Sequence, residues 1–158
     1  MSLGILTPGL AYDAVQILKP QIERFLQIHA KRQHLAIVVT AVEEINPRNP
    51  DKSFEEDCFV VDGIGNSEDW EHDYKMIALS KAEKSVRTGM ATAKLGPQYL
   101  LDADTVFWGS EVLDGIVVAC SGVEPYYDEM VSMWIAATIR AFCKDAFAQL
   151  PDGTKFIE

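Results

Sequence analysis

The segment SEVLDGIVVACSGVEPYYDEM, residues 110–130, determines the predicted fold of this chain. Asp114-Gly115 separates two apolar runs and is a strong signal for a two-residue type I′ turn, in which both central residues need positive φ. A β-hairpin is therefore expected here. Pro125 follows the second run and opens a helix, because proline fits the first helical position.

Outward from this hairpin, helical and strand patterns alternate along the chain. Apolar residues recur at helical spacing over about 8–31, where Pro20 should bend the helix, and over about 72–89, where the lysines are expected on the solvent side. β-branched runs that begin at Leu35 and end at Asp62-Gly63 predict two paired strands joined by a long loop. The order α-β-β-α-β-β-α predicts one α+β domain over residues 1–158, with an antiparallel sheet of about four to five strands flanked by helices.

Composition restricts the partners of the chain. Its 24 acidic and 14 basic residues give a net charge of −10, which repels phosphate backbones, so nucleic acid and anionic membrane are not expected to bind. No apolar stretch approaches the ~18 residues of a membrane span, and the N-terminus lacks the pattern of an export signal. Cys58, Cys120 and Cys143 are odd in number and lie in apolar surroundings, which favours reduced thiols in the cytoplasm.

The predicted last helix carries two neighbouring apolar stripes. The first stripe contains Tyr126, Met130, Trp134, Ala137 and Ala141, and the second contains Val131, Ile135, Ile139, Phe142 and Ala146. Together they cover more than half of the helix circumference, which is wider than one sheet face needs. The pattern therefore predicts a homo-oligomer with this helix at the interface.

Cys120 and Ser121 lie at a strand-to-helix turn, the place where some hydrolases present a nucleophile. A nucleophile needs a base within hydrogen-bond reach, and no distinctive motif surrounds His29, His34 or His72. The G-x-S-x-G elbow is also missing. We therefore favour a buried strand thiol followed by a serine that hydrogen-bonds the turn.

Acidic side chains offer two other candidates for chemistry. Asp128 and Glu129 could act as an acid–base pair, but adjacent helical residues diverge by about 100°, so complementing the helix dipole is the favoured role. The acidic run NSEDWEHDY, residues 66–74, lacks the ligand spacing and central glycine of a calcium loop. No metal ligands are assigned.

Aromatic residues flank the hairpin and the start of the last helix. Trp108, Tyr126 and Tyr127 are most simply core residues. If they line a cleft instead, they could stack on a flat ligand.

Three segments resemble the GlcG/HbpS-like domain family, which is associated with haem binding and with C-terminal domains of some corrinoid adenosyltransferases. LTPGLAYDAVQILKPQIE (6–23) is similar to the first helix of that family. VVDGIGNSEDWEHDYKMIALSKAEKSV (60–86) resembles its Asp-Gly turn and Lys-Ala helix, matched by Asp62-Gly63 and Lys81-Ala82. VLDGIVVACSGVEPYYDEM (112–130) resembles its last hairpin and helix start, matched by Ser121-Gly122 and Asp128-Glu129. The resemblance implies a profilin-like fold and homo-oligomers.

These observations predict a non-catalytic, oligomeric, cytoplasmic protein that binds a small molecule, with haem, a corrinoid or another organic metabolite as ligand. The expected ligand-binding residues are Asp62, Gly63, Trp108, Ser121, Gly122, Tyr126 and Asp128. One alternative is a small enzyme acting on an organic acid or other metabolite of a catabolic pathway, with Asp128 or His72 as general base. Another is a structural or assembly module without a ligand.

Overall fold

A computed structural model describes residues 4–157 and has an α+β fold. The strands are β1 (Leu35–Ala41), β2 (Val60–Ile64), β3 (Ser110–Leu113) and β4 (Ile116–Ser121). The helices are α1 (Pro8–His29), α2 (Phe54–Asp57), α3 (Tyr74–Thr88) and α4 (Pro125–Ala148), with short 3₁₀ turns η1 (Ser67–Asp69), η2 (Thr92–Lys94) and η3 (Pro97–Tyr99). The predicted fold class and element order are confirmed, and the short α2 is an addition within the long β1–β2 loop.

The four strands form a single antiparallel sheet in the order β2-β1-β4-β3. The β3–β4 hairpin turns at Asp114 and Gly115, whose φ angles of 50° and 82° are both positive, as the predicted turn requires. β1 lies in the middle and pairs with both β2 and β4. The first and last hairpins are therefore joined along β1 into one sheet.

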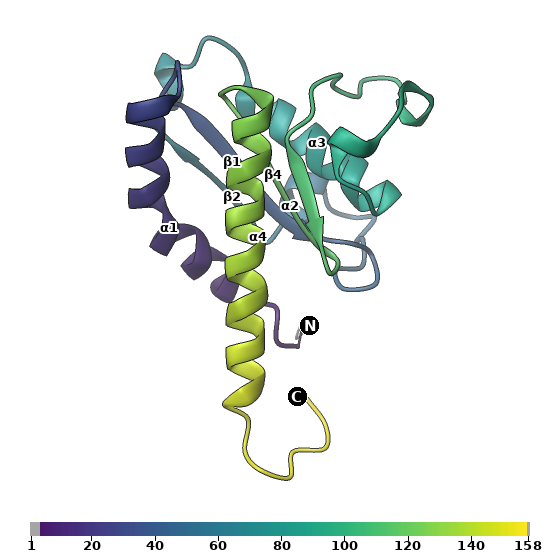
Figure 1. Cartoon of the computed structure of the whole chain (residues 1–158). Coiled ribbons are helices and arrows are strands. Elements are labelled where there is room, and N and C mark those ends of the chain that lie inside the picture. The colour runs from purple at the N-terminus through teal and green to yellow at the C-terminus, as the bar shows by residue number, and fades with distance from the viewer. Residues whose placement is uncertain (1–3, 158) are drawn as a thin grey trace.

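Helices cover both faces of this sheet (Figure 1). α1 and α4 pack on one face, where Ile37 and Val39 of β1 point, and α3 packs on the other, where Ala36 and Val38 point. Alternate residues of a strand face opposite sides, so β1 is buried at every position. This burial explains its unbroken apolar sequence.

α1 packs against α4 as well as against the sheet. The ring of Phe25 meets Tyr127 edge-on at a centroid distance of 4.9 Å and Trp134 at 5.6 Å. Part of the wide apolar surface of α4 is therefore covered within the chain. Pro20 lies inside α1 without ending it, and the helix stops at His29 rather than at Lys31.

The C-terminal half of α4 projects beyond the sheet (Figure 1). Beside this projection, a hollow of about 430 Å³ is lined mainly by apolar side chains of Ile45, Ile116, Cys143 and Phe147. Within residues 4–157, no helix combines the length and apolar character needed to cross a membrane.

Candidate functional site

A pocket of about 480 Å³ lies where the end of β4 leads into α4, next to α3. Its wall combines charged, aromatic and apolar side chains. The lining residues used below are Lys31, Arg32, Tyr74, Ile77, Lys81 and Phe107, together with Ser121, Gly122, Glu124, Pro125 and Asp128. The pocket therefore joins the turn after β4 to residues from three distant parts of the chain.

A buried ion pair forms part of the pocket wall. Lys81 Nζ lies 3.2 Å from Asp128 Oδ2 and donates a hydrogen bond of 2.7 Å to the carbonyl oxygen of Cys120. The other carboxylate oxygen of Asp128 accepts from the backbone N–H of Val123 at 3.3 Å. These bonds tie α3 to both sides of the strand-to-helix turn.

The structure corrects the prediction for two lysines of α3. Lys81 and Lys84 were expected on the solvent side of α3, yet their exposed fractions are 1% and 3%. Lys84 donates to the carbonyl oxygen of Thr105 at 2.6 Å, which anchors the segment before β3. Asp128 was expected to complement the helix dipole, and it does lie in the first turn of α4, where it is also buried and paired with Lys81. In each case a partner within the fold makes burial of the charge tolerable.

Burial perturbs the protonation of the pair. Removal from water raises the pKa of Asp128 from 3.8 to about 7, although Lys81 and, more weakly, Arg32 pull it down. The same desolvation lowers the pKa of Lys81, which Asp128 partly opposes. For this carboxyl group, the cost of burial exceeds the attraction of its partner. Asp128 can therefore take up or release a proton near neutral pH.

Gly109 provides the space in which this pair lies. Its φ is +145°, and a Cβ added there would lie 2.7 Å from Cβ of Asp128 and 2.8 Å from Nζ of Lys81. Ser132 on α4 donates to the Gly109 carbonyl at 2.9 Å, and Thr92 accepts from its N–H at 3.0 Å. The glycine is thus fixed where any side chain would displace the ion pair.

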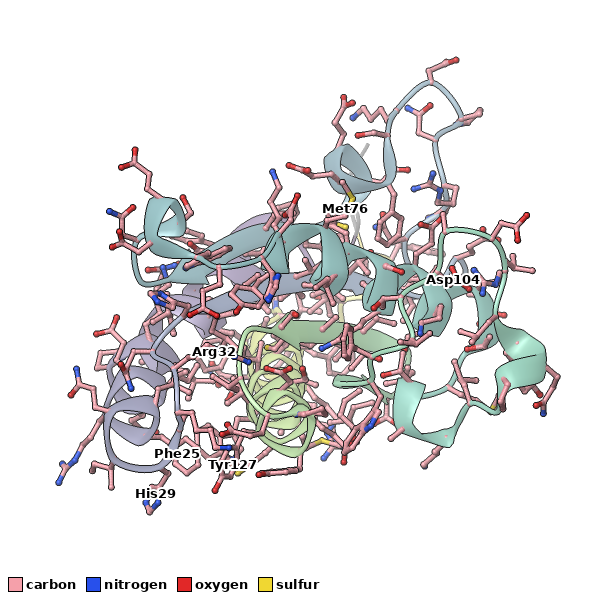
Figure 2. The ribbon with its side chains drawn as sticks, turned by 90° about the horizontal axis from the view of Figure 1, so that it is seen from above. Phe25, His29, Arg32, Met76, Asp104 and Tyr127 are labelled. Atoms are coloured by element: carbon pink, nitrogen blue, oxygen red, sulfur yellow. The ribbon has the colours of Figure 1, made fainter. Side chains whose placement is uncertain are left out.

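Arg32 and Tyr74 also line the pocket and contact each other. Nε of Arg32 donates to the carbonyl oxygen of Gly122 at 2.8 Å, and its guanidinium lies 5.7 Å from the centre of the Tyr74 ring. Figure 2 shows Arg32 beside the loop that leads into α4. Tyr74 is only 4% exposed, yet its hydroxyl oxygen is buried without a hydrogen-bond partner. Such an atom is unusual in a folded protein, and Oε2 of Glu124, which also lines the pocket, is another.

The predicted site residues are divided between the two faces of the sheet. Gly63 and Ser121 both pair with Ala36, so they face α3, whereas Asp62 pairs with Ile37 on the face of α1 and α4. The carboxylate of Asp62 binds Lys19 at 2.8 Å and Gln16 at 2.8 Å, both from α1. Its pKa is lowered, because these bonds outweigh desolvation, the largest single influence, which acts to raise it.

Gly63 and Asp62 line a neighbouring hollow rather than the pocket. This hollow has a volume of about 570 Å³ and shares His72 with the pocket. The Trp70 ring contacts the ring of Tyr74 at a centroid distance of 5.7 Å. Trp70 lines the hollow and Tyr74 lines the pocket, so their contact joins the linings of the two spaces.

Only some of the other predicted residues reach the pocket. Ser121, Gly122 and Asp128 line it, whereas Trp108, half-buried, and Tyr126, 57% exposed, do not. Tyr126 instead packs edge-on against Tyr127 at 4.7 Å.

Sequence reasoning from the residues did not assign Arg32, Tyr74 or Phe107 to a site. Lys81 entered only as a match to a family pattern. It stands three residues after Ala78 and next to Ala82, on the apolar stripe of α3. Because this spacing places Lys81 on the buried face of the helix, the sequence did contain a signal that its charge would be buried.

The nucleophile interpretation of Cys120 is not supported. The thiol is fully buried and faces the α1 and α4 side, and burial raises its pKa to about 12. A thiol in this state does not supply the thiolate that nucleophilic attack requires. Its backbone carbonyl, rather than its sulfur, contacts the site, because it accepts the hydrogen bond from Lys81.

The pocket residues fit haem poorly. His72 in the lining offers the imidazole that haem iron would need as an axial ligand. The charged side chains of Lys31, Arg32, Lys81, Glu124 and Asp128 lie among the apolar ones, however, and suit a flat apolar macrocycle poorly. Within residues 4–157, no group of three or more His, Cys, Asp or Glu side chains is placed to hold a metal ion. The lining fits a smaller polar molecule better than a tetrapyrrole.

Comparison with known proteins finds no family model, no curated protein and no solved structure that matches this chain.

Proposed function

We propose that this domain binds a small organic molecule, without transforming it, in the pocket between α3 and the start of α4. The observation that carries the proposal is that Tyr74, whose buried hydroxyl has no hydrogen-bond partner within residues 4–157, is one of the residues that line this pocket. Leaving such a group unpaired costs about 1–3 kcal/mol. A ligand with a polar atom at this point would restore the missing hydrogen bond.

The size and lining of the pocket support the same function. Its volume of about 480 Å³ lies within the range of about 300–1,000 Å³ found for small-molecule sites. Ile77, Phe107 and Pro125 offer apolar contacts, while Arg32 and Tyr74 offer polar ones. In small-molecule sites, a small number of polar groups in a partly apolar wall fixes the orientation of the ligand.

A fragment screen followed by NMR tests the proposal. ¹⁵N-labelled protein is titrated with fragments, and binding in the pocket should shift the amide signals of Gly122 and Val123. Tyr74→Phe should weaken binding by about tenfold, because only the hydroxyl is lost. Tyr99→Phe is the matched control, since Tyr99 lies on the surface away from the pocket. If no fragment shifts these amides, the binding function is refuted and a structural module becomes the better interpretation.

Haem titration provides a separate test. The charged lining favours a smaller ligand, so we expect no Soret band from bound haem at micromolar concentration. A band that disappears in His72→Ala would contradict this expectation, because His72 is the imidazole in the pocket lining.

Acid–base catalysis is a second candidate, favoured by the position of Asp128. Its carboxyl group lines the pocket, and burial raises its pKa to about 7, a value suited to proton transfer at neutral pH. The test is prolonged incubation of a bound fragment, followed by NMR for conversion. Conversion that is lost in Asp128→Asn would favour the enzyme, and an unchanged fragment favours the binding protein.

Further parts of the proposal concern assembly, location and family. A second copy of the chain is proposed to pack on the projecting end of α4, where the Phe147 side chain is 64% exposed. A cytoplasmic location is proposed because Cys58, Cys120 and Cys143 are all free thiols. Membership of the GlcG/HbpS-like family is proposed on the sequence resemblance, and Lys81, Ser121, Gly122 and Asp128 from that resemblance lie around one pocket.

A further inference from the structure

The pocket carries an excess of positive charge in a strongly acidic protein. Lys31, Arg32 and Lys81 line it together with Glu124 and Asp128. Asp128 is already engaged with Lys81, which leaves two cationic side chains against the single carboxylate of Glu124. Since the whole chain has a net charge of −10, this local excess is opposite in sign to the rest of the protein.

Arg32 has no ion-pair partner within residues 4–157. By contrast, Arg48, Arg87 and Arg140 each pair with an aspartate, at 3.1, 2.9 and 3.1 Å. The one hydrogen bond of Arg32 uses Nε and the Gly122 carbonyl. Its two terminal nitrogens therefore keep the forked arrangement of donors that matches a carboxylate.

The guanidinium of Arg32 is also held in a defined orientation. Its Nε is fixed by the backbone of the turn after β4, and its Cζ atom lies over the face of the Tyr74 ring. A pre-oriented guanidinium loses less conformational entropy on binding than a free one. Tyr74, whose buried hydroxyl is also unpartnered, lines the same pocket.

We infer that the ligand is a small organic monocarboxylate, held by Arg32 at its acidic group and by the Tyr74 hydroxyl at an oxygen atom. This inference rests on the proposed binding function. The pocket has one positive charge in excess, which one carboxylate group would neutralise. A phosphate dianion carries a second negative charge, which the carboxylate of Glu124 would repel. The apolar part of the molecule packs on Ile77, Phe107 and Pro125.

Matched pairs of carboxylates and carboxamides test the charge requirement. Benzoate is compared with benzamide, and isobutyrate with isobutyramide, by NMR titration of the full chain. Each carboxylate should shift the amides of Gly122 and Val123 and bind about tenfold or more tightly than its amide, because only the acid pairs with the guanidinium. Benzoate affinity should fall at high salt, while benzamide affinity should not.

Arg32→Gln should reduce benzoate affinity to that of benzamide. Arg140→Gln removes the same charge near the β3–β4 turn, where Arg140 pairs with Asp114, and should leave benzoate binding unchanged. If Arg32→Gln fails to fold, Arg32→Lys is used, which keeps the charge but loses the fork and should weaken benzoate binding partially. The wild-type comparison of acid and amide needs no variant.

The outcomes separate this inference from the proposed function. If uncharged fragments bind in the pocket as tightly as their carboxylates, the ligand class is wrong and the binding function survives. If phenyl phosphate binds more tightly than benzoate, the preferred ligand is a phosphate and not a carboxylate, and the inference is overturned. If neither the carboxylates nor any fragment shifts the pocket amides, both proposals fail.

Discussion

Lys81 Nζ lies 3.2 Å from Asp128 Oδ2, and the two side chains have exposed fractions of only 1% and 3%. Burying both charges costs free energy that their attraction repays incompletely. Removal of one partner leaves the other charge buried and unpaired, which costs more than removal of both. This asymmetry leads to the first prediction.

Lys81→Met or Asp128→Leu alone should lower the free energy of unfolding by about 3–5 kcal/mol. The double variant should recover most of that loss, because no unpaired charge remains buried. Urea denaturation of the four proteins forms the required double-mutant cycle. Lys75→Met is the control, since its pair with Glu55 is about half exposed and contributes at most about 1 kcal/mol. Additive losses in the double variant would show that the two residues are not coupled.

The stability contributed by Asp128 should depend on pH. Its pKa is about 7 in the folded state and near 3.8 when exposed, so unfolding between these values releases a proton. The free energy of unfolding should therefore fall as pH rises from about 4 to 7, by at most about 1.4 kcal/mol per pH unit. Lys81 has a lowered pKa, and its effect lies toward alkaline pH, where stability rises instead.

Other carboxylates titrate in the same range, so the comparison must isolate Asp128. Asp62 and Asp104 have lowered pKa values and act in the opposite direction, losing stability as pH falls. The useful quantity is the stability of the wild type minus that of the Lys81→Met/Asp128→Leu variant. A difference that stays flat from pH 4 to 7 would mean that burial does not perturb Asp128.

Gly122→Ala should destabilise the fold more than Gly89→Ala. Gly122 has φ +148°, and an added Cβ would overlap the backbone carbonyl oxygen of His34, which cannot move without shifting the start of β1. We expect a loss of about 2–4 kcal/mol from clash and strain together. Gly89 ends α3 with φ +71° and open space around it, so its alanine variant should lose only about 1 kcal/mol. Equal melting temperatures of the two variants would contradict this account.

Tyr74→Phe should stabilise the ligand-free protein by about 1 kcal/mol while it weakens ligand binding. The hydroxyl is buried without a partner, so its removal relieves a desolvation cost. Thermal denaturation with and without bound benzoate measures both effects. A loss of stability in the ligand-free variant would indicate that the hydroxyl has a partner in solution.

Light scattering should detect an oligomer that depends on the projecting end of α4. Phe147→Ser removes an apolar side chain that is 64% exposed, and it should shift the protein toward the monomer. Ile17→Ser, with a 65% exposed side chain on α1, is the matched control and should leave the mass unchanged. A wild-type protein that is already monomeric at high concentration would refute self-association.

The sequence predicted those parts of the fold that depend on neighbouring residues. Asp114-Gly115 fixes its hairpin locally, and Pro125 is the first residue of α4, as its preference for that position predicted. The sheet face on which the Asp62 side chain lies depends instead on strand register, because a shift of one residue moves each side chain of the strand to the other face. No local pattern sets that register, which explains why Asp62 and Ser121 were expected in one site.

Prediction of the pocket failed for a related reason. Arg32, Tyr74 and Asp128 are far apart in the sequence, and only packing of α3 on the sheet brings them together. Lys81 could have been found from its position on the apolar stripe of α3. Its ion pair could not be predicted in the same way, because the partner, Asp128, lies 47 residues further along the chain and helical periodicity does not identify it.

The small side chains between α3 and the sheet have a consequence for sequence variation. Ala36 and Ala119 from the strands meet Ala78 and Ala82 from the helix. These residues set the distance between the two layers, and that distance determines whether a lysine at position 81 can reach the Cys120 carbonyl. In diverged copies of this domain we expect these alanines to change together with position 81, because a thicker layer would require a different cation or none.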